Sequence, residues 1–189
     1  MNDQEENMNN FKIHTIETAP AESKNILQKI SDKWGFIPNF MAVIAESPAM
    51  LESYMAMNDI FDKTSLTETE RQIILMTNAN KHECHYCMAA HTTVSQMAKV
   101  PDDVIESLRD NKPIKDKKLE ALRKFTSIIN ETRGWPSENE VSDFLAAGYS
   151  KEVILDIIVG TSMKVMSNYT NHITKTKVDQ VFETNAWSK

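Results

Sequence analysis

The chain has 189 residues, of which 41% are hydrophobic and 25% charged, and its formal net charge is −6. These values are ordinary for a globular protein, and the acidic excess argues against binding to a nucleic-acid backbone, which relies mainly on Lys and Arg. No apolar run approaches the ~20 residues that a membrane-spanning helix needs. The first ten residues lack the pattern of a signal peptide, so the expected location is the cytoplasm.

Hydrophobic residues recur mainly at helical spacing, and only four glycines interrupt the chain. This pattern predicts an all-α fold of about eight to nine helices. Residues 1–10 are expected to form a disordered polar tail, and residues 11–189 a single helical domain. The expected helices cover, in chain order, residues 20–34, 40–46, 48–61, 67–81, 83–99, 102–111, 116–133, 138–147 and 151–170.

Several of these helices carry their own boundary signals. Thr67, with Glu70 three residues later, forms a capping box at the start of the fourth helix. Pro101 ends the fifth, and Ser150 is a candidate N-cap of the last. That last helix, 151–170, is apolar almost all round, which indicates burial, either in the core alone or partly at a subunit contact.

Two cysteines, Cys84 and Cys87, lie three residues apart, and His91 follows the second by four residues. On a helix these three positions share one face. The helix start favours a thiolate at Cys84, whereas His91 is a candidate base or imidazolium partner for Cys87. Either influence lowers a thiol pKa from its usual ~8.5. Because two sulfurs at this spacing can also close a disulfide, the motif predicts a reversible dithiol–disulfide site.

The cysteine motif is also compatible with a packing role or a metal site. Buried cysteines are often inert packing residues. A zinc ion could instead take its ligands from the two cysteines, His91 and one of two further histidines, His82 and His85. Structural zinc usually uses two separated ligand pairs, and this chain has no second cysteine pair. We therefore expect neither a metal nor a cofactor, and we expect His82 and His85 to be exposed residues at a helix start.

The residues around the cysteines resemble the alkylhydroperoxidase D-like proteins, in particular their peroxidase-related branch, within the carboxymuconolactone decarboxylase superfamily. The resemblance covers about residues 12–187. The segments that carry it are Gly35-Phe36-Ile37-Pro38-Asn39, Ser47-Pro48, Leu66-Thr67-x-x-Glu70-Arg71, Cys84-x-x-Cys87-x-x-x-His91-Thr92, Tyr86, Ala147-Gly148-Tyr149-Ser150, Asn168-Tyr169 and Asp179.

This resemblance implies an all-helical protein that assembles into homotrimers or homohexamers and reduces hydroperoxides with its thiols. In the family the second cysteine attacks the peroxide, a role that falls here on Cys87. The first, here Cys84, resolves the sulfenic acid into a disulfide, and the histidine, here His91, helps to deprotonate the attacking thiol. The implied partners are a hydroperoxide substrate and a dithiol or protein electron donor, such as a peroxiredoxin or a lipoyl system.

One departure concerns the family's proton relay, which includes a glutamate twelve positions before the first cysteine. This chain has Gln72 there. An amide can hydrogen-bond, but it cannot accept a proton as a carboxylate does. Gln72 therefore belongs to the predicted site, and it leaves the speed of turnover open.

Three functions compete on this basis. The leading one is a thiol-dependent hydroperoxide reductase that cycles between dithiol and disulfide. The alternatives are a thiol-based redox sensor or binding protein with low turnover, which the relay substitution favours, and a carboxymuconolactone decarboxylase, whose chemistry needs no cysteine pair.

Overall fold

The computed structural model describes residues 11–188, so the tail expected at residues 1–10 lies outside the described part. Residues 11–188 form nine α-helices and one 3-10 helix and contain no strand, which confirms the predicted all-α fold. The elements are α1 (Ala21–Trp34), α2 (Asn39–Ile44), α3 (Pro48–Phe61), α4 (Glu68–Lys81), α5 (His85–Met97), α6 (Asp102–Arg109), α7 (Lys117–Thr132), α8 (Glu138–Ala146), α9 (Lys151–Thr174) and the 3-10 helix η1 (Gln180–Asn185).

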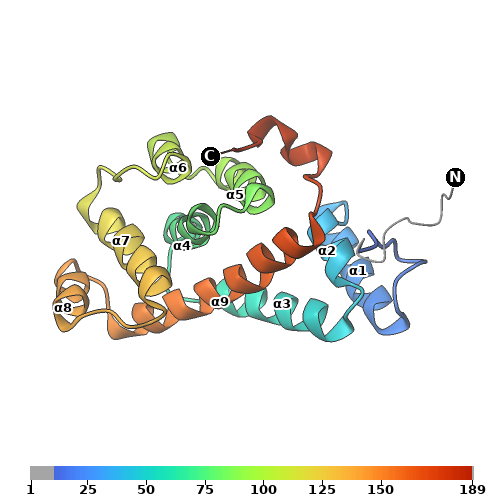
Figure 1. The fold of residues 1–189 in the computed structure, drawn as a ribbon, viewed down its shortest axis with the longest axis horizontal. Helices are drawn as coiled ribbons and strands as arrows, with labels where there is room; N and C mark the ends of the chain where they lie inside the picture. Colours follow the sequence, from blue (N-terminus) through green and yellow to red (C-terminus); the bar gives the residue numbers. More distant parts are fainter. Residues whose placement is uncertain (1–10, 189) are drawn as a thin grey trace, which may run out of the picture.

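Helix α4 lies at the centre of the fold, where α5, α6, α7 and α9 pack around it (Figure 1). Nine consecutive residues of α4, from Gln72 to Asn80, are buried. A helix that is buried on every face presents its polar side chains to other protein groups instead of water. The side-chain amides of Gln72, Asn78 and Asn80 donate hydrogen bonds inside the molecule, whereas Thr77 Oγ1 is buried and has no partner among the described residues.

Helix α9 spans 24 residues and packs against α2, α3, α4, α5 and α7. Side chains of two neighbouring helices approach the backbone of α9 closely at Gly160. A Cβ atom built on Gly160 would lie 2.7 Å from Cγ2 of Ile74 and 2.9 Å from Cζ of Phe61. A side chain here would require Ile74 and Phe61 to shift, so the glycine allows α9 to pack this closely against α3 and α4.

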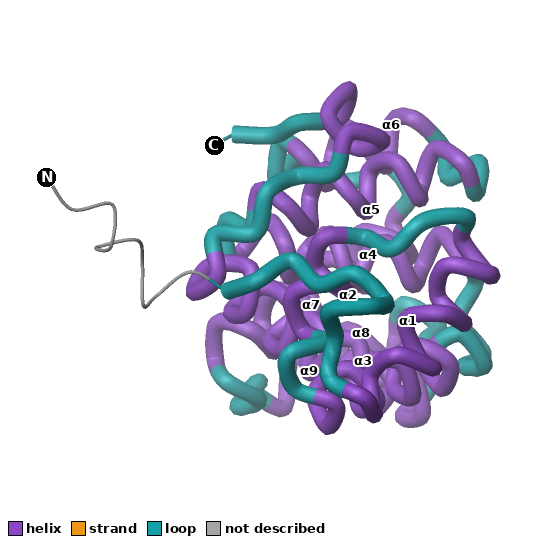
Figure 2. The backbone as a smooth tube through the Cα atoms, turned by 90° about the vertical axis from the view of Figure 1, so that its right-hand side faces the viewer, coloured by secondary structure: helices purple, strands orange, loops and turns teal. Residues whose placement is uncertain are grey.

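The C-terminal segment returns across the molecule, and η1 packs against α5 (Figure 2). A buried carboxylate joins it to two other elements. Asp179 accepts a hydrogen bond from the Tyr86 hydroxyl of α5 at 2.7 Å and another from the backbone N–H of Asn39 at 2.9 Å. The Tyr86 oxygen also accepts from the backbone N–H of Phe40 at 3.2 Å. The start of α2, the first turn of α5 and the C-terminal segment are thus tied together.

The helix ends follow their local signals, with one informative difference. Thr67 and Glu70 form the predicted capping box, and the Ser150 side chain accepts from the backbone of α9 as predicted. Helix α5, however, begins at His85, two residues later than expected, because Glu83 adopts a positive φ of 53° and separates it from α4. In the described part of the chain, no helix is long and apolar enough to cross a membrane.

Candidate functional site

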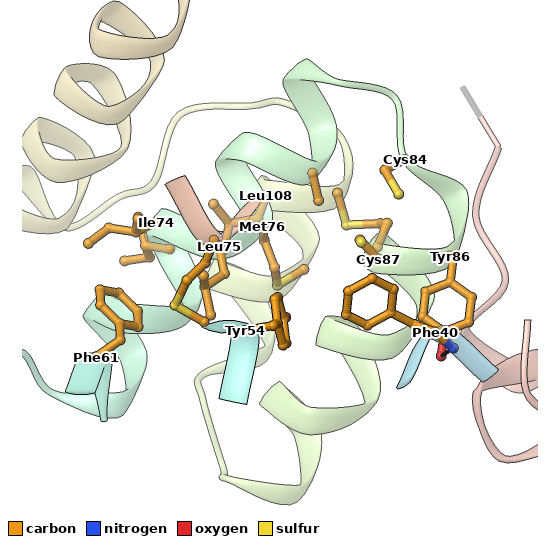
Figure 3. Close-up of a cluster of buried hydrophobic side chains, with 14 of the residues drawn as sticks. Phe40, Tyr54, Phe61, Ile74, Leu75, Met76, Cys84, Tyr86, Cys87 and Leu108 are labelled. Carbon is orange, nitrogen blue, oxygen red and sulfur yellow. Dashed lines mark hydrogen bonds between the residues drawn. The ribbon is translucent and has the colours of Figure 1, made fainter. Parts of the chain in front are cut away.

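Both cysteines lie in the core at the start of α5. Cys84 is the N-cap residue, with an exposed fraction of 1%, and Cys87 is the third helical residue, with an exposed fraction of 3%. Both are free thiols. Figure 3 shows them in the buried cluster that also holds Phe40, Tyr54 and Tyr86. The predicted pair is therefore assembled and is shielded from bulk solvent.

Two polar residues of α9, a helix that packs against α5, contact the cysteine sulfurs. The amide nitrogen of Asn171 donates to Cys87 Sγ at 3.3 Å and lies 4.0 Å from Cys84 Sγ. The Ser167 hydroxyl lies 3.8 Å from Cys87 Sγ. Both residues are buried, and they lie one turn apart on the helix, so their side chains meet the same partner. Cys87 Sγ therefore has closer polar contacts than Cys84 Sγ.

The two thiols differ in acidity. Burial acts to raise the pKa of Cys87, but a hydrogen bond from Cys84, the positive charge of Lys164 and the polar contacts from α9 together hold that pKa well below its ordinary value. The pKa of Cys84 is raised, first because its thiol bonds to the Cys87 sulfur and second because it is buried. The pair therefore favours a thiolate on Cys87 and a protonated thiol on Cys84.

The positive charge beside Cys87 belongs to Lys164, one of the most buried residues of α9, with an exposed fraction of 1%. Burial acts to lower the pKa of Lys164, but the nearby acidic groups of Cys87 and Tyr54 outweigh burial and raise it. The ammonium nitrogen also lies 3.0 Å from Nε2 of His91. Lys164 thus interacts with both the Cys87 sulfur and the His91 ring.

A chain of hydrogen bonds continues from His91 toward the surface. Burial and the neighbouring Lys164 charge both lower the pKa of His91 well below its ordinary value, so the ring is neutral. Its Nε2 accepts from the ammonium, and Nδ1 therefore carries the proton and donates to Oε1 of Gln72 at 3.0 Å. The Gln72 amide in turn donates to Oε1 of Glu68 at 2.8 Å. A glutamate at position 72 could accept from His91 but could not donate to Glu68.

The structure thus assembles the four predicted residues, with one change of neighbours. Both hydrogen bonds of His91 within the described chain go to Gln72 and Lys164, and no hydrogen bond joins it to Cys87. Lys164 is absent from the sequence prediction. The sequence feature that points to a buried lysine is its position between Met163 and Val165, in a helix that is apolar almost all round.

The other two histidines have different surroundings. His85 is exposed, as expected, and its Nδ1 donates to the backbone oxygen of Trp187 at 2.7 Å. The expectation for His82 is wrong, because it is half-buried at the end of α4, between Oδ1 of Asn168 and Nδ2 of Asn130, both at 2.8 Å. Within residues 11–188, no group of three or more His, Cys, Asp or Glu side chains is arranged to hold a metal ion.

Comparison with known proteins identifies solved structures with a similar fold. No protein-family model matches the chain, and no similar sequence was found among curated proteins. The solved structures do give matches. One is the alkylhydroperoxidase AhpD core of an uncharacterized peroxidase-related protein from Ralstonia eutropha JMP134, with a TM-score of 0.80 at 19% identity, over 91% of this chain and 93% of that one.

Two further structures share the architecture. An uncharacterized peroxidase-related protein from Silicibacter sp. TM1040 superposes with a TM-score of 0.78 at 18% identity, over 96% of this chain and 97% of that one. The debrominase Bmp8, solved in complex with 2,3,4-tribromopyrrole, gives a TM-score of 0.72 at 12% identity, over 87% of this chain and 89% of that one. Likeness at these identities concerns the fold. The chain has the alkylhydroperoxidase AhpD core fold that its sequence motifs led us to expect.

Proposed function

We propose that this protein is a thiol-dependent hydroperoxide reductase that uses Cys87 as the attacking residue and Cys84 as the resolving residue. The observation that carries the proposal is a pair of adjacent buried thiols, of which Cys87 Sγ accepts a hydrogen bond from Asn171 Nδ2 at 3.3 Å. The pKa of Cys87 is lowered and that of Cys84 is raised, with Lys164 next to the more acidic sulfur. An inert pair of packing cysteines needs no buried cation beside it.

The proposed cycle has three steps. The Cys87 thiolate attacks one peroxide oxygen, the O–O bond breaks, and the sulfur loses two electrons to become a sulfenic acid. The leaving alkoxide or hydroxide takes a proton from the Lys164 ammonium and departs as an alcohol or water, and the proton that the Cys84 thiol later gives up restores the ammonium. Cys84 then attacks the sulfenic sulfur, which forms the disulfide and releases water, and an external dithiol reduces the disulfide back to two thiols.

The other residues of the site act through Lys164. Its ammonium stabilises the Cys87 thiolate and is a source for the proton that the leaving oxygen takes. His91 holds the ammonium through Nε2, and Gln72 holds the neutral ring through Nδ1. In this proposal His91 and Gln72 are positioning residues, so the chemistry does not depend on a carboxylate at position 72.

The test is peroxide consumption with a dithiol donor, compared among wild type, Cys87→Ser and Cys84→Ser. We expect Cys87→Ser to abolish consumption, because no other thiolate lies at the site. Cys84→Ser should complete one oxidation and stop with a sulfenic acid or a mixed disulfide on Cys87, which mass spectrometry detects. Ser162→Ala, on an exposed position of α9, is the control and should behave as wild type.

Turnover by Cys87→Ser at the wild-type rate would contradict the assignment of the attacking residue. The same variants distinguish the two alternative functions. A redox sensor would form the disulfide at a rate no faster than a free thiol reacts with peroxide. A carboxymuconolactone decarboxylase would keep its activity when both cysteines are replaced by serine.

We also propose that the protein works as a homo-oligomer, a trimer or a hexamer, with a dithiol or protein electron donor in a reducing cytoplasm. Support for the oligomer comes from α9, which leaves four large apolar side chains exposed. These are Leu155, Ile158, Tyr169 and Ile173.

A further inference from the structure

Asn168 is a fully buried amide with an unused donor. Its exposed fraction is 0%, and its Oδ1 accepts a hydrogen bond from Nδ1 of His82 at 2.8 Å. Its Nδ2, which carries two N–H groups, has no hydrogen-bond partner among the described residues. Buried side-chain donors almost always have partners in folded proteins. Seven buried side-chain atoms of residues 11–188 lack a partner, and Asn168 Nδ2 is one of them.

Asn171, one turn later on α9, has an unused acceptor where Asn168 has an unused donor. Its nitrogen is used, since Nδ2 donates to Cys87 Sγ at 3.3 Å. Its Oδ1 is buried and has no hydrogen-bond partner among the described residues. The unused donor and the unused acceptor thus belong to neighbouring amides, and the second of these amides contacts the attacking sulfur.

Residues three apart on a helix have Cβ atoms about 5–6 Å from one another, so one small molecule can meet both amides. That molecule must accept from Asn168 and donate to Asn171. Water has this capacity, and so does hydrogen peroxide, whose two oxygens each carry an O–H group and lone pairs. The exposed fractions of 1% and 3% at Cys84 and Cys87 favour such a small molecule over a bulky organic hydroperoxide.

We propose that Asn168 and Asn171 bind hydrogen peroxide beside Cys87, with Asn171 Oδ1 accepting from the attacked oxygen and Asn168 Nδ2 donating to the oxygen that leaves. This proposal rests on the proposed peroxidase function and names its substrate. As the S–O bond forms and the O–O bond breaks, negative charge grows on the leaving oxygen, which departs as hydroxide and takes up a proton to become water. The Asn168 donor stabilises that charge, as an oxyanion-hole donor does.

The discriminating variant is Asn168→Asp, which keeps an oxygen for His82 and replaces the unused donor by an acceptor. Two second-order rates are measured for Cys87, one with hydrogen peroxide and one with iodoacetamide, both read by mass spectrometry. Alkylation needs the Cys87 thiolate and access to the buried sulfur but no peroxide site, so the ratio of the two rates corrects for both and isolates peroxide binding. We expect this ratio to fall about 100-fold, the lower end of the range for loss of an oxyanion donor.

Two further variants keep the result interpretable. Asn168→Leu removes the same donor without adding a charge, and the ratio should fall similarly. Asn130→Asp alters the other partner of His82, at 2.8 Å from its Nε2, and should leave the ratio within about twofold of wild type. A ratio that stays at the wild-type value in both Asn168 variants would overturn the proposal while leaving the peroxidase function intact.

Wild-type protein that reacts with hydrogen peroxide no faster than a free thiol would instead overturn the proposed function, and the substrate assignment with it. A crystal structure of the reduced protein then tests the binding position on its own. A water oxygen within hydrogen-bond distance of both Asn168 Nδ2 and Asn171 Oδ1 supports the position. Amides that pair with protein atoms instead would contradict it.

Discussion

Lys164 has the least expected surroundings of any residue at the site, because a lysine is rarely fully buried without a partner. Its partners are the sulfur of Cys87 on one side and a neutral imidazole on the other. Removing a charge from water is costly, and an opposite charge nearby offsets that cost. A thiolate and an ammonium that are buried together therefore stabilise each other's charged form.

Replacing this lysine by methionine tests the electrostatic pairing. Lys164→Met removes the cation that lowers the pKa of Cys87, so that pKa should rise and the thiolate fraction at neutral pH should fall, by about tenfold for each pKa unit. The measurement is the rate of alkylation of Cys87 by iodoacetamide as a function of pH. We expect the midpoint of the profile to move to higher pH.

Lys164→Arg keeps the charge and should restore part of the reactivity, which a purely structural role for the lysine does not require. Lys151→Met, on an exposed position of the same helix, controls for the loss of a positive charge in general. An unchanged alkylation profile in Lys164→Met would show that the cation does not set the acidity of Cys87.

At this scale the sequence predicted the cysteines and the histidine because their spacing on a helix is a local property. The role of Lys164 depends on which way α9 faces, and a lysine in a helix is ordinarily taken as solvent-exposed. Asn168 and Asn171 were missed as a pair for the same reason, since their partners lie on α4 and α5, more than 80 residues away in the chain.

At the scale of the elements, the contact of α9 with α3 and α4 decides where the site residues lie. A glycine inside a helix costs about 1 kcal/mol relative to alanine, and here Gly160 allows two side chains to approach the backbone. Lys164 lies one turn further along α9 on the same face. The close crossing therefore helps to set the distance between the ammonium and the sulfur.

Gly160→Ala should be destabilising, although alanine is the better helix former. Its Cβ would overlap Ile74 and Phe61 at 2.7 and 2.9 Å, and overpacking of this kind costs about 1–3 kcal/mol. The free energy of unfolding, from urea denaturation followed by circular dichroism, measures the loss. Ser162→Ala on the same helix is the matched control, and a gain in stability for Gly160→Ala would refute the close crossing.

The elements themselves were largely predictable, because capping residues and prolines act over three or four residues. The capping box at Thr67 and the N-cap at Ser150 formed as the sequence indicated. The 3-10 helix η1 was not predicted, since it has no periodic pattern of its own and depends on α5 for its burial. The later start of α5 depends on the left-handed conformation of Glu83, a residue without a marked preference for it.

At the scale of the whole molecule, the outer side of α9 is the feature that a single copy leaves unexplained. Its four exposed apolar residues, Leu155, Ile158, Tyr169 and Ile173, fall within about 60° of one another at 100° per residue, so they lie along one side of the helix. Single exposed hydrophobic residues are normal, but several on one side of a helix indicate a protein contact. We expect a second copy of the chain to cover it.

Light scattering coupled to size-exclusion chromatography should therefore give a mass that is a multiple of the 21.6 kDa monomer. Ile158→Glu combined with Ile173→Glu should lower that mass, because two buried charges oppose association. Val181→Glu changes an apolar residue that is exposed on η1 and should leave the mass unchanged. A wild-type protein that elutes as a monomer would argue against the oligomer.

The C-terminal segment gives the molecule an internal optical reporter. The ring of Trp187 lies 5.5 Å from the ring of His85, whose neighbour in sequence is Cys84. Forming a disulfide draws Cys84 toward Cys87 and changes the first turn of α5, which carries His85. The emission of Trp187 should respond to that movement, so oxidation and reduction can be timed by fluorescence in a variant whose other two tryptophans, Trp34 and Trp135, are replaced by phenylalanine.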